Sequence, residues 1–172
     1  MALEIIYFIE LIVAYVVPLY FANAAPIIFH GKKPVDFGKK IGNKRILGDG
    51  KTILGALFGI VVGSFCGILI YLIFPEIQII SSNYILLAFL LSAGAILGDI
   101  VKSFFKRRVG IKSGEKWFLV DQLDFIIGGL VLSSFFRLPE IELIVFLFVV
   151  TVFVHTATNI AAFKLKLKKV PW

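Results

Sequence analysis

Long apolar runs separated by short polar stretches dominate the pattern of this chain. A helix needs about 20 residues to cross the hydrocarbon core of a bilayer. Five segments meet that length, at residues 3–25, 52–74, 84–105, 117–136 and 143–163. The pattern predicts an all-α integral membrane protein with five transmembrane helices, organised as a single transmembrane domain over residues 1–172.

Composition agrees with this class of protein. Hydrophobic residues make up 59% of the chain and charged residues 17%, and the mean hydropathy is +0.98. Soluble domains are nearer half apolar and a quarter charged. The net charge of +7 would also suit nucleic acid, but a basic cytoplasmic face against anionic lipid explains it in a membrane protein. We therefore expect no nucleic-acid partner.

The distribution of the basic residues predicts the orientation. Seventeen of the 18 fall within residues 32–51, 102–116 and 164–169, which lie on one side of a five-span protein, and Arg137 alone falls on the other side. Basic loops remain in the cytoplasm. We expect a multi-pass protein of the cell membrane with its N-terminus outside, its C-terminus in the cytoplasm and two basic cytoplasmic loops.

Charged residues concentrate between residues 98 and 124, beside the apolar runs. Charges at such depth usually serve a function. Asp99, Lys102, Ser103 and Lys106 follow the spacing i, i+3, i+4 and i+7, so they share one helix face, and Asp121 and Asp124 share a face of the next helix. The predicted catalytic residues are therefore Asp99, Lys102, Ser103, Lys106, Asp121 and Asp124.

The same residue types indicate a metal and phosphate. Mg²⁺ prefers oxygen ligands and is often shared with substrate phosphates, which makes Asp99, Asp121 and Asp124 the predicted ligands. Salt bridges alone would also explain carboxylates beside lysines. Six cations in the third loop and its edges face four acidic residues, however, and this surplus favours a metal–polyphosphate ligand.

Polar residues of all five predicted spans lie near their cytoplasmic ends. Asn23, Asp49, Asp99, Asp121 and His155 are examples. This common level predicts a polar cavity that opens to the cytoplasm. We do not expect His155 to be catalytic, because the attack of an anionic phosphate needs no general base. Its expected role is that of a packed, hydrogen-bonded histidine or of a lipid-site residue.

The first cytoplasmic loop ends in Gly48-Asp49-Gly50-Lys51-Thr52. A phosphate-binding P-loop would need glycine where Arg45 stands, and a strand before it, so this is not a P-loop. Backbone N–H groups of a glycine-rich turn at a helix start can still bind phosphate. A solvated basic loop facing lipid headgroups is the open alternative.

A glycine recurs every fourth residue in the second predicted span, at Gly55, Gly59, Gly63 and Gly67. Such stripes permit close helix contact in lipid. The stripe predicts tight packing within the bundle or across a homodimer.

One stretch also resembles a known family. Gly98-Asp99-x₃-Ser103-x₂-Lys106-Arg107-x₄-Lys112, followed by Asp121-x₂-Asp124, is similar to the signature of the CDP-diacylglycerol synthases. Those membrane cytidylyltransferases join CTP to phosphatidic acid with Mg²⁺ and release pyrophosphate. The chain departs from them at Ser113, where the family has Asp, at Gln122, where it has Arg, and in lacking His-Gly-Gly before the paired aspartates.

The departures, together with Asn23-x₂-Pro26 and Asp49-Gly50-Lys51-Thr52-x₂-Gly55, resemble the archaeal branch, the CDP-archaeol synthases. The resemblance implies a Mg²⁺-dependent cytidylyltransferase whose partners are CTP and an isoprenoid glycerophosphate lipid, 2,3-di-O-geranylgeranylglyceryl phosphate. The residues it implies for nucleotide binding are Asn23, Pro26, Asn43, Lys44, Asp49, Gly50, Lys51, Thr52, Arg107 and Lys112.

Three other classes of protein fit part of the pattern, and one of them, a non-catalytic lipid-binding scaffold, explains the basic loops but not the buried aspartate pair. A CDP-alcohol phosphotransferase also uses metal-bound aspartate at a membrane face, but its denser Asp-Gly and Ala-Arg pattern is not found. A cation-coupled transporter would suit Glu10, which lies deeper in the first span, yet transporter sites lie near the midplane between repeats. The charges here lie at one interface.

Overall fold

The computed structural model describes residues 2–79, 82–113 and 115–166, and it confirms a helical membrane architecture. The elements are α1 (Ala2–Ile28), a small hairpin of β1 (Lys40–Ile41) and β2 (Lys44–Arg45), α2 (Ile53–Ile73), the 3₁₀ helix η1 (Pro75–Ile79), α3 (Tyr84–Arg108), α4 (Val120–Ser134) and α5 (Ile141–Lys164). Lys168 and Lys169 of the predicted basic tail lie outside the described residues.

Three helices of the described chain are long and apolar enough to cross a membrane: α1 from Glu4 onward, α2 and α3. The apolar stretch of α5 is shorter and covers Ile141–Ala157. With 15 residues, α4 is about 22 Å long, less than the ~30 Å of a hydrocarbon core. The five spans and their orientation therefore remain a prediction.

The fourth helix begins later than the sequence predicts, at Val120 instead of residue 117. Leu119 adopts a left-handed conformation with φ of 65°, which interrupts helical geometry for a residue with a side chain. Asp121 also accepts a hydrogen bond from the Trp117 backbone N–H at 2.7 Å. The turn between them replaces the first helical turn expected from the apolar pattern.

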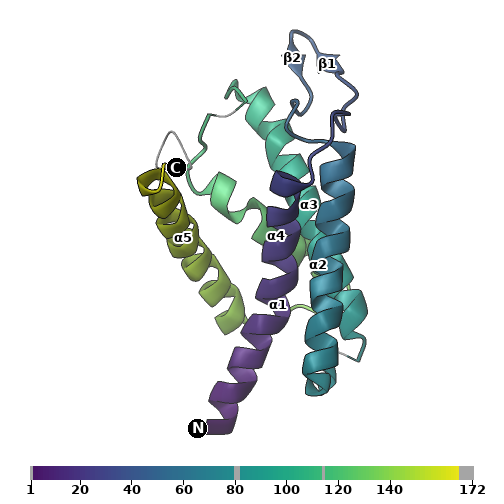
Figure 1. Ribbon diagram of the computed structural model, residues 1–172, viewed down its shortest axis with the longest axis vertical. Coiled ribbons are helices and arrows are strands. Elements are labelled where there is room, and N and C mark those ends of the chain that lie inside the picture. The colour runs from purple at the N-terminus through teal and green to yellow at the C-terminus, as the bar shows by residue number, and fades with distance from the viewer. Residues whose placement is uncertain (1, 80–81, 114, 167–172) are drawn as a thin grey trace.

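Helices α1, α2 and α3 run side by side, and α4 crosses α3 (Figure 1). Large buried side chains, among them Tyr15, Leu19, Leu91 and Phe125, form the core between them. Helix α5 lies beside α1 and α4 and is held to α1 by a hydrogen bond of 2.8 Å from the Tyr20 hydroxyl to Thr151 Oγ1. In the same view α1 starts at the end opposite the hairpin, and α5 ends toward the hairpin.

The glycine stripe of α2 packs within the chain. Gly55, Gly59, Gly63 and Gly67 are the buried residues of this helix. A Cβ at Gly63 would overlap the Pro18 carbonyl of α1 and the Ser92 hydroxyl of α3. Helices α1 and α3 therefore already cover the stripe. A homodimer contact through these glycines would need the face of α2 that α1 and α3 occupy.

A second glycine contact joins α3 to α4. A Cβ at Gly98 would overlap the Asp124 carbonyl oxygen, and a Cβ at Gly128 would overlap the Gly94 carbonyl oxygen. The two backbones can approach this closely because neither helix has a side chain at the crossing. The crossing brings the charged faces of α3 and α4 together.

Candidate active site

The first loop is organised around Asp36, which the sequence analysis did not single out. Its carboxylate is 94% buried and accepts hydrogen bonds from the backbone N–H groups of Gly38 at 3.0 Å and Leu47 at 2.9 Å. Arg45 adds an ion pair of 2.9 Å. Burial alone would raise the pKa of Asp36, but these hydrogen bonds hold the pKa well below its ordinary value. Only the Asp at the start of a glycine-rich segment signals such a turn in the sequence.

The hairpin is fastened to the end of α3 by two reciprocal contacts. Lys44 Nζ donates to the Arg108 carbonyl at 3.2 Å, and Arg108 Nη2 donates to the Arg45 carbonyl at 2.5 Å. Arg45 also pairs with Asp49 at 2.6 Å. The loop is therefore a folded element seated on the helices, which argues against a purely solvated loop.

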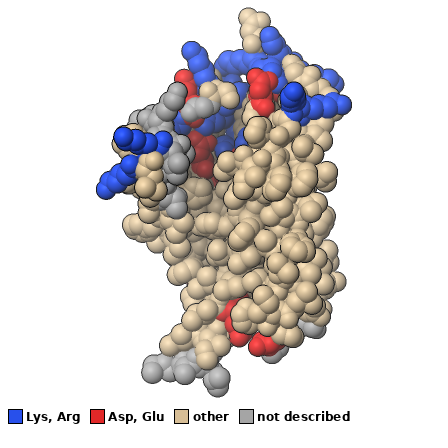
Figure 2. Space-filling view, in the orientation of Figure 1, with Lys and Arg blue, Asp and Glu red and all other residues tan. Residues whose placement is uncertain are grey.

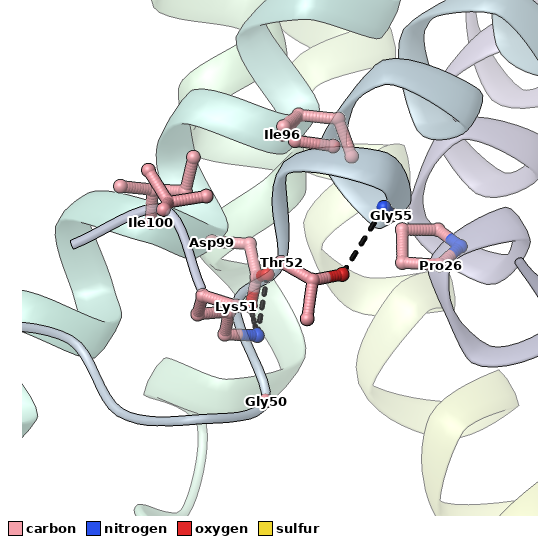
Figure 3. A pocket seen from close by; sticks show the side chains of 10 residues that line it. Pro26, Gly50, Lys51, Thr52, Gly55, Ile96, Asp99 and Ile100 are labelled. Carbon is pink, nitrogen blue, oxygen red and sulfur yellow. Dashed lines mark hydrogen bonds and ion pairs between the residues drawn. The ribbon is translucent and has the colours of Figure 1, made fainter. Parts of the chain in front are cut away.

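The loop ends by placing Lys51 and Thr52 against α3 and α2. Lys51 Nζ donates to Asp99 Oδ1 at 2.7 Å, and Thr52 Oγ1 caps α2 by accepting from the Gly55 N–H at 3.1 Å (Figure 3). Thr52 also accepts from the Gly31 N–H at 3.2 Å. The predicted nucleotide-binding residue Thr52 thus has a capping role in this structure, and Lys51 reaches the carboxylates.

Three aspartates from two helices converge on one ammonium group. Lys102 Nζ lies 3.0 Å from Asp99 Oδ1, 3.3 Å from Asp121 Oδ1 and 2.8 Å from Asp124 Oδ2. The side chain of Lys102 is only 12% exposed and that of Asp124 only 4%. A charge at this depth is costly unless paired, and the cluster provides that pairing.

Lys106 completes the cluster from the next helical turn. It is buried, and its Nζ lies 2.8 and 2.7 Å from the two carboxylate oxygens of Asp121. Three lysines thus neutralise three aspartates, which is the salt-bridge arrangement that the surplus of cations had argued against. The sequence cannot reveal this, because one of the three lysines comes from the first loop and because Arg107, counted in the surplus, donates instead to the Ile111 carbonyl at 2.7 Å.

Ser103 lies on the same face but uses its hydroxyl locally. Its Oγ donates to the Asp99 backbone carbonyl at 2.8 Å, one turn earlier in α3. The side chain still lines a polar cavity beside Lys102 and Lys106. This hydrogen bond anchors Ser103 in the helix face that carries the cluster.

Two polar cavities meet at Gly50 and Lys51. One, of about 430 Å³, lies between the first loop and α1 and is lined by Asn23, Pro26, His30, Asp49, Thr52 and Asp99. The other, of about 150 Å³, is lined by Lys51, Lys102, Ser103, Lys106, Arg107 and Ser113. The structure therefore brings Asn23 and Pro26 of α1 to the same cavity as Lys51 and Asp99.

An apolar groove reaches the cluster from the other side. It has a volume of about 540 Å³ between α3 and α4, and Lys102 and Asp124 are its charged lining residues. Val101, Phe105, Ile127 and Val131 line it and are about half exposed. The cluster thus lies where an apolar groove and polar cavities come together.

Other predicted residues lie at the edge of this site. Lys44, Asp49, Arg107 and Lys112 line a further basic cavity of about 370 Å³ between the first loop and the segment that follows α3. Asn43 is exposed at the tip of the hairpin and lines none of these cavities. The structure does not bring Asn43 to the cluster.

The three predicted metal ligands surround Lys102. As they lie, no group of three His, Cys, Asp or Glu side chains in the described ranges could hold a metal ion. Oxygens about 3 Å from a shared centre suit an ammonium, whereas Mg²⁺ needs 2.0–2.1 Å. Asp124 Oδ2 is nevertheless buried and has the Lys102 ammonium as its charged partner at 2.8 Å, so the donor set fits a cation, and binding of Mg²⁺ by these carboxylates would require Lys102 to move.

His155 lies against aromatic rings of α1 and α4. Its ring centroid is 6.3 Å from that of Tyr20 and 5.5 Å from that of Phe125. It lines none of the cavities around the cluster. This packed position agrees with the expectation from the sequence.

Charge is segregated along the molecule. Figure 2 shows Lys and Arg gathered at the hairpin end, acidic side chains visible in a hollow just below them, and a wide uncharged surface beneath. Fold and site together define a multi-pass membrane protein with a charged, cavity-lined site at one end of its helices.

Known proteins share this architecture and this sequence. The family model described as "CarS-like: CDP-archaeol synthase" matches residues 3–172. CDP-archaeol synthase of Methanospirillum hungatei is 42% identical over 150 residues, covering 81% of this chain and 89% of the relative. That of Methanocaldococcus jannaschii is 43% identical over 148 residues, covering 81% and 83%.

A solved structure extends the likeness to three dimensions. It is described as an intramembrane enzyme for archaeal membrane lipids biosynthesis, and it superposes with a TM-score of 0.78 at 35% identity, over 86% of this chain and 92% of that one. The chain belongs to the CDP-archaeol synthase family. It is therefore an enzyme, a membrane-embedded nucleotidyltransferase of lipid biosynthesis.

Proposed function

We propose that this enzyme transfers CMP from CTP to an isoprenoid ether-lipid phosphate, giving CDP-archaeol and pyrophosphate at the cytoplasmic side of a five-span protein. The observation that carries the proposal is the junction at Lys102, which lines both a polar cavity and the apolar groove. A substrate with a phosphate and long apolar tails suits a groove that ends at cations. A water-soluble polyphosphate suits the polar side.

The nucleotide phosphates are assigned to the basic cavity of Lys51, Lys102, Lys106 and Arg107. Phosphoryl and nucleotidyl transfer depend mainly on positioning and on neutralising charge, which fixed cations supply. Gly48 and Gly50 leave the loop backbone close to this cavity. The neighbouring cavity lined by Asn23, Pro26 and Thr52 leaves room for the rest of the nucleotide.

The lipid enters the groove between α3 and α4 from the side of the bundle. Its tails lie along Val101, Phe105 and Ile127, and its phosphate reaches Lys102. An oxygen of that phosphate attacks the α-phosphorus of CTP. As the new P–O bond forms, the bond to the β-phosphate oxygen breaks, and pyrophosphate leaves with the electron pair toward Lys106 and Arg107.

Asp99, Asp121 and Asp124 would hold Mg²⁺, which when bound neutralises developing charge on the phosphate oxygens. The residues of the chain then divide the work. Lysines orient the phosphates, while the aspartates keep the lysines and the metal in place. The attacking group is already an anion at neutral pH, so no side chain has to remove a proton.

One assay tests the whole proposal. Purified enzyme is given each of the four nucleoside triphosphates with either the geranylgeranyl ether-lipid phosphate or a diacyl phosphatidic acid, with and without Mg²⁺, and pyrophosphate release is measured. We expect release with CTP, the ether lipid and Mg²⁺ together. Equal release with all four nucleotides, or release that EDTA leaves unchanged, would contradict the proposal.

A further inference from the structure

We propose that Lys102 is an internal counter-ion that occupies the position of the metal among the three aspartates and must leave it when the metal–nucleotide complex binds. The inference deepens the proposed function, because it assumes that the nucleotide delivers a divalent ion to this cluster. It assigns to Lys102 the control of when metal can bind.

The geometry distinguishes Lys102 from its neighbours. Its ammonium lies within 3.3 Å of carboxylates from both α3 and α4. Among the described residues, Lys51 pairs with Asp99 alone, and Lys106 pairs with Asp121 alone. Lys102 is thus the central cation, and the other two are peripheral.

The most buried carboxylate depends on this ammonium. Asp124 is 93% buried, and among the described residues the ammonium of Lys102 is the charged partner of its Oδ2. Its ion pair of 2.8 Å with Lys102 is what compensates the charge. Leaving a buried carboxylate without a partner is strongly unfavourable. Molecules in which Lys102 has left Asp124 are therefore rare until another cation arrives.

The surroundings also give Lys102 a second position. Its side chain borders the polar cavity that Lys51, Lys106 and Arg107 line. A lysine has a flexible four-carbon stem and three rotatable donors. Phosphate oxygens in that cavity would accept hydrogen bonds from the Lys102 ammonium while the aspartates bind the metal. One exchange then compensates the charges of both the phosphates and the aspartates.

This exchange has a measurable consequence. While Lys102 holds the cluster, only the small fraction of molecules in which it has moved can bind a divalent ion, and the apparent affinity falls by that fraction. The enzyme without nucleotide should bind metal weakly. Removing the Lys102 charge should remove the competition.

The test measures Mn²⁺ binding to the purified protein by electron paramagnetic resonance, without nucleotide or lipid. Lys102→Met keeps an unbranched apolar side chain and removes the charge, while Lys51→Met and Lys106→Met remove one peripheral charge each and serve as matched controls. We expect Mn²⁺ to bind Lys102→Met at least tenfold more tightly than the wild type and both controls.

Several results would overturn the proposal. Equal tightening in all three variants would mean that net charge alone sets affinity, and unchanged affinity in Lys102→Met would mean that Lys102 does not compete. If Lys102→Met fails to fold, Lys102→Gln replaces it, since its amide can still donate to the carboxylates. Failure of both variants to fold even when prepared with Mn²⁺ would also contradict it, because the metal should replace a displaceable cation.

The outcome is separable from that of the proposed function. Tighter Mn²⁺ binding in Lys102→Met without any CMP transfer by the wild type would overturn the proposed reaction and support the exchange. CMP transfer by the wild type with no specific effect of Lys102→Met on Mn²⁺ affinity would support the proposed reaction and overturn the exchange.

Discussion

At the scale of residues, the cluster is a network of six charges that carries no net charge of its own. Each aspartate has at least one lysine partner within 3.3 Å. Neutral clusters of this kind reduce the cost of holding ions near lipid. An anionic substrate must then bring, or recruit, additional positive charge.

Asp124→Asn tests the role of the most buried carboxylate. The change keeps the shape but removes a predicted metal ligand, so we expect CMP transfer to fall on the order of 100-fold or more. Rates are measured against Mg²⁺ concentration, with thermal unfolding recorded for the same protein. Glu76→Gln, an exposed carboxylate in η1, is the control. Near-normal transfer at ordinary Mg²⁺ would make Asp124 a structural residue.

Asp36 makes the stability of the first loop depend on pH. Its pKa in the folded protein lies below the ordinary value, so its contribution is complete above about pH 4 and is lost as pH falls through the lowered pKa. Asp36→Asn should therefore lower the melting temperature at pH 7, and the gap to the wild type should narrow below about pH 4. A gap that stays constant from pH 7 to pH 3 would contradict this. Asp49→Asn, 86% exposed, is the matched control.

The sequence supports some of these residue assignments and misses others. Helical spacing places Asp99, Lys102 and Lys106 on one face, because that spacing is a property of a single helix. It cannot say which lysine lies between which aspartates, because the partners come from α4 and from the first loop. Asp36 was missed because turns held by side chains leave no periodic pattern.

At the scale of elements, the crossing of α3 and α4 assembles the site. Gly94 and Gly98 of α3 meet Gly128 and Gly129 of α4 without side chains between them. Asp99 follows Gly98 directly, and Asp124 lies one turn before Gly128. The closeness of the two helices therefore sets the distance between the carboxylates.

Gly128→Ala tests that dependence. A methyl group there would overlap the Gly94 carbonyl oxygen and the Gly98 backbone, and overpacking of this kind costs about 1–3 kcal/mol. We expect both a lower melting temperature and a loss of CMP transfer, because the helices must separate. Val149→Ile adds a methyl group to an exposed position of α5 and should change neither. A fully active, fully stable Gly128→Ala would show that the crossing is not critical.

The apolar pattern predicts the start of a helix well where the helix begins together with its apolar run. It gives the start of α3 at Tyr84 and the start of α2 within one residue of Ile53. It fails at α4, because the positive φ of Leu119 and the hydrogen bond at Asp121 are not visible as hydrophobicity. The glycine stripe was recognised, but its partners on α1 and α3 could not be read from one helix.

At the scale of the whole molecule, the charges of the hairpin end predict the orientation of the protein in the membrane. Lys and Arg side chains gather at that end (Figure 2), and the cluster lies beside the first loop there. Such a basic end is expected in the cytoplasm. The predicted topology therefore places the site and its soluble substrate on the same side.

Cysteine labelling tests the orientation. With Cys66 removed, single cysteines at the exposed positions Lys39 and Lys116 should react with an impermeant reagent only after the cytoplasmic face is opened, and one at Glu76 should react in intact cells. All three positions are exposed at the protein surface. Labelling of Lys39→Cys or Lys116→Cys in intact cells would reverse the orientation.

If the apolar groove between α3 and α4 receives the lipid as proposed, it also determines how the enzyme meets this substrate. Its half-exposed lining residues, such as Phe105 and Val131, face outward from the helices, so an acceptor with apolar tails arrives by lateral diffusion within the leaflet. The relevant measure of that substrate is its mole fraction among the surrounding lipids. Adding inert lipid or detergent at constant bulk concentration should therefore slow the reaction by surface dilution, while CTP continues to obey ordinary solution kinetics.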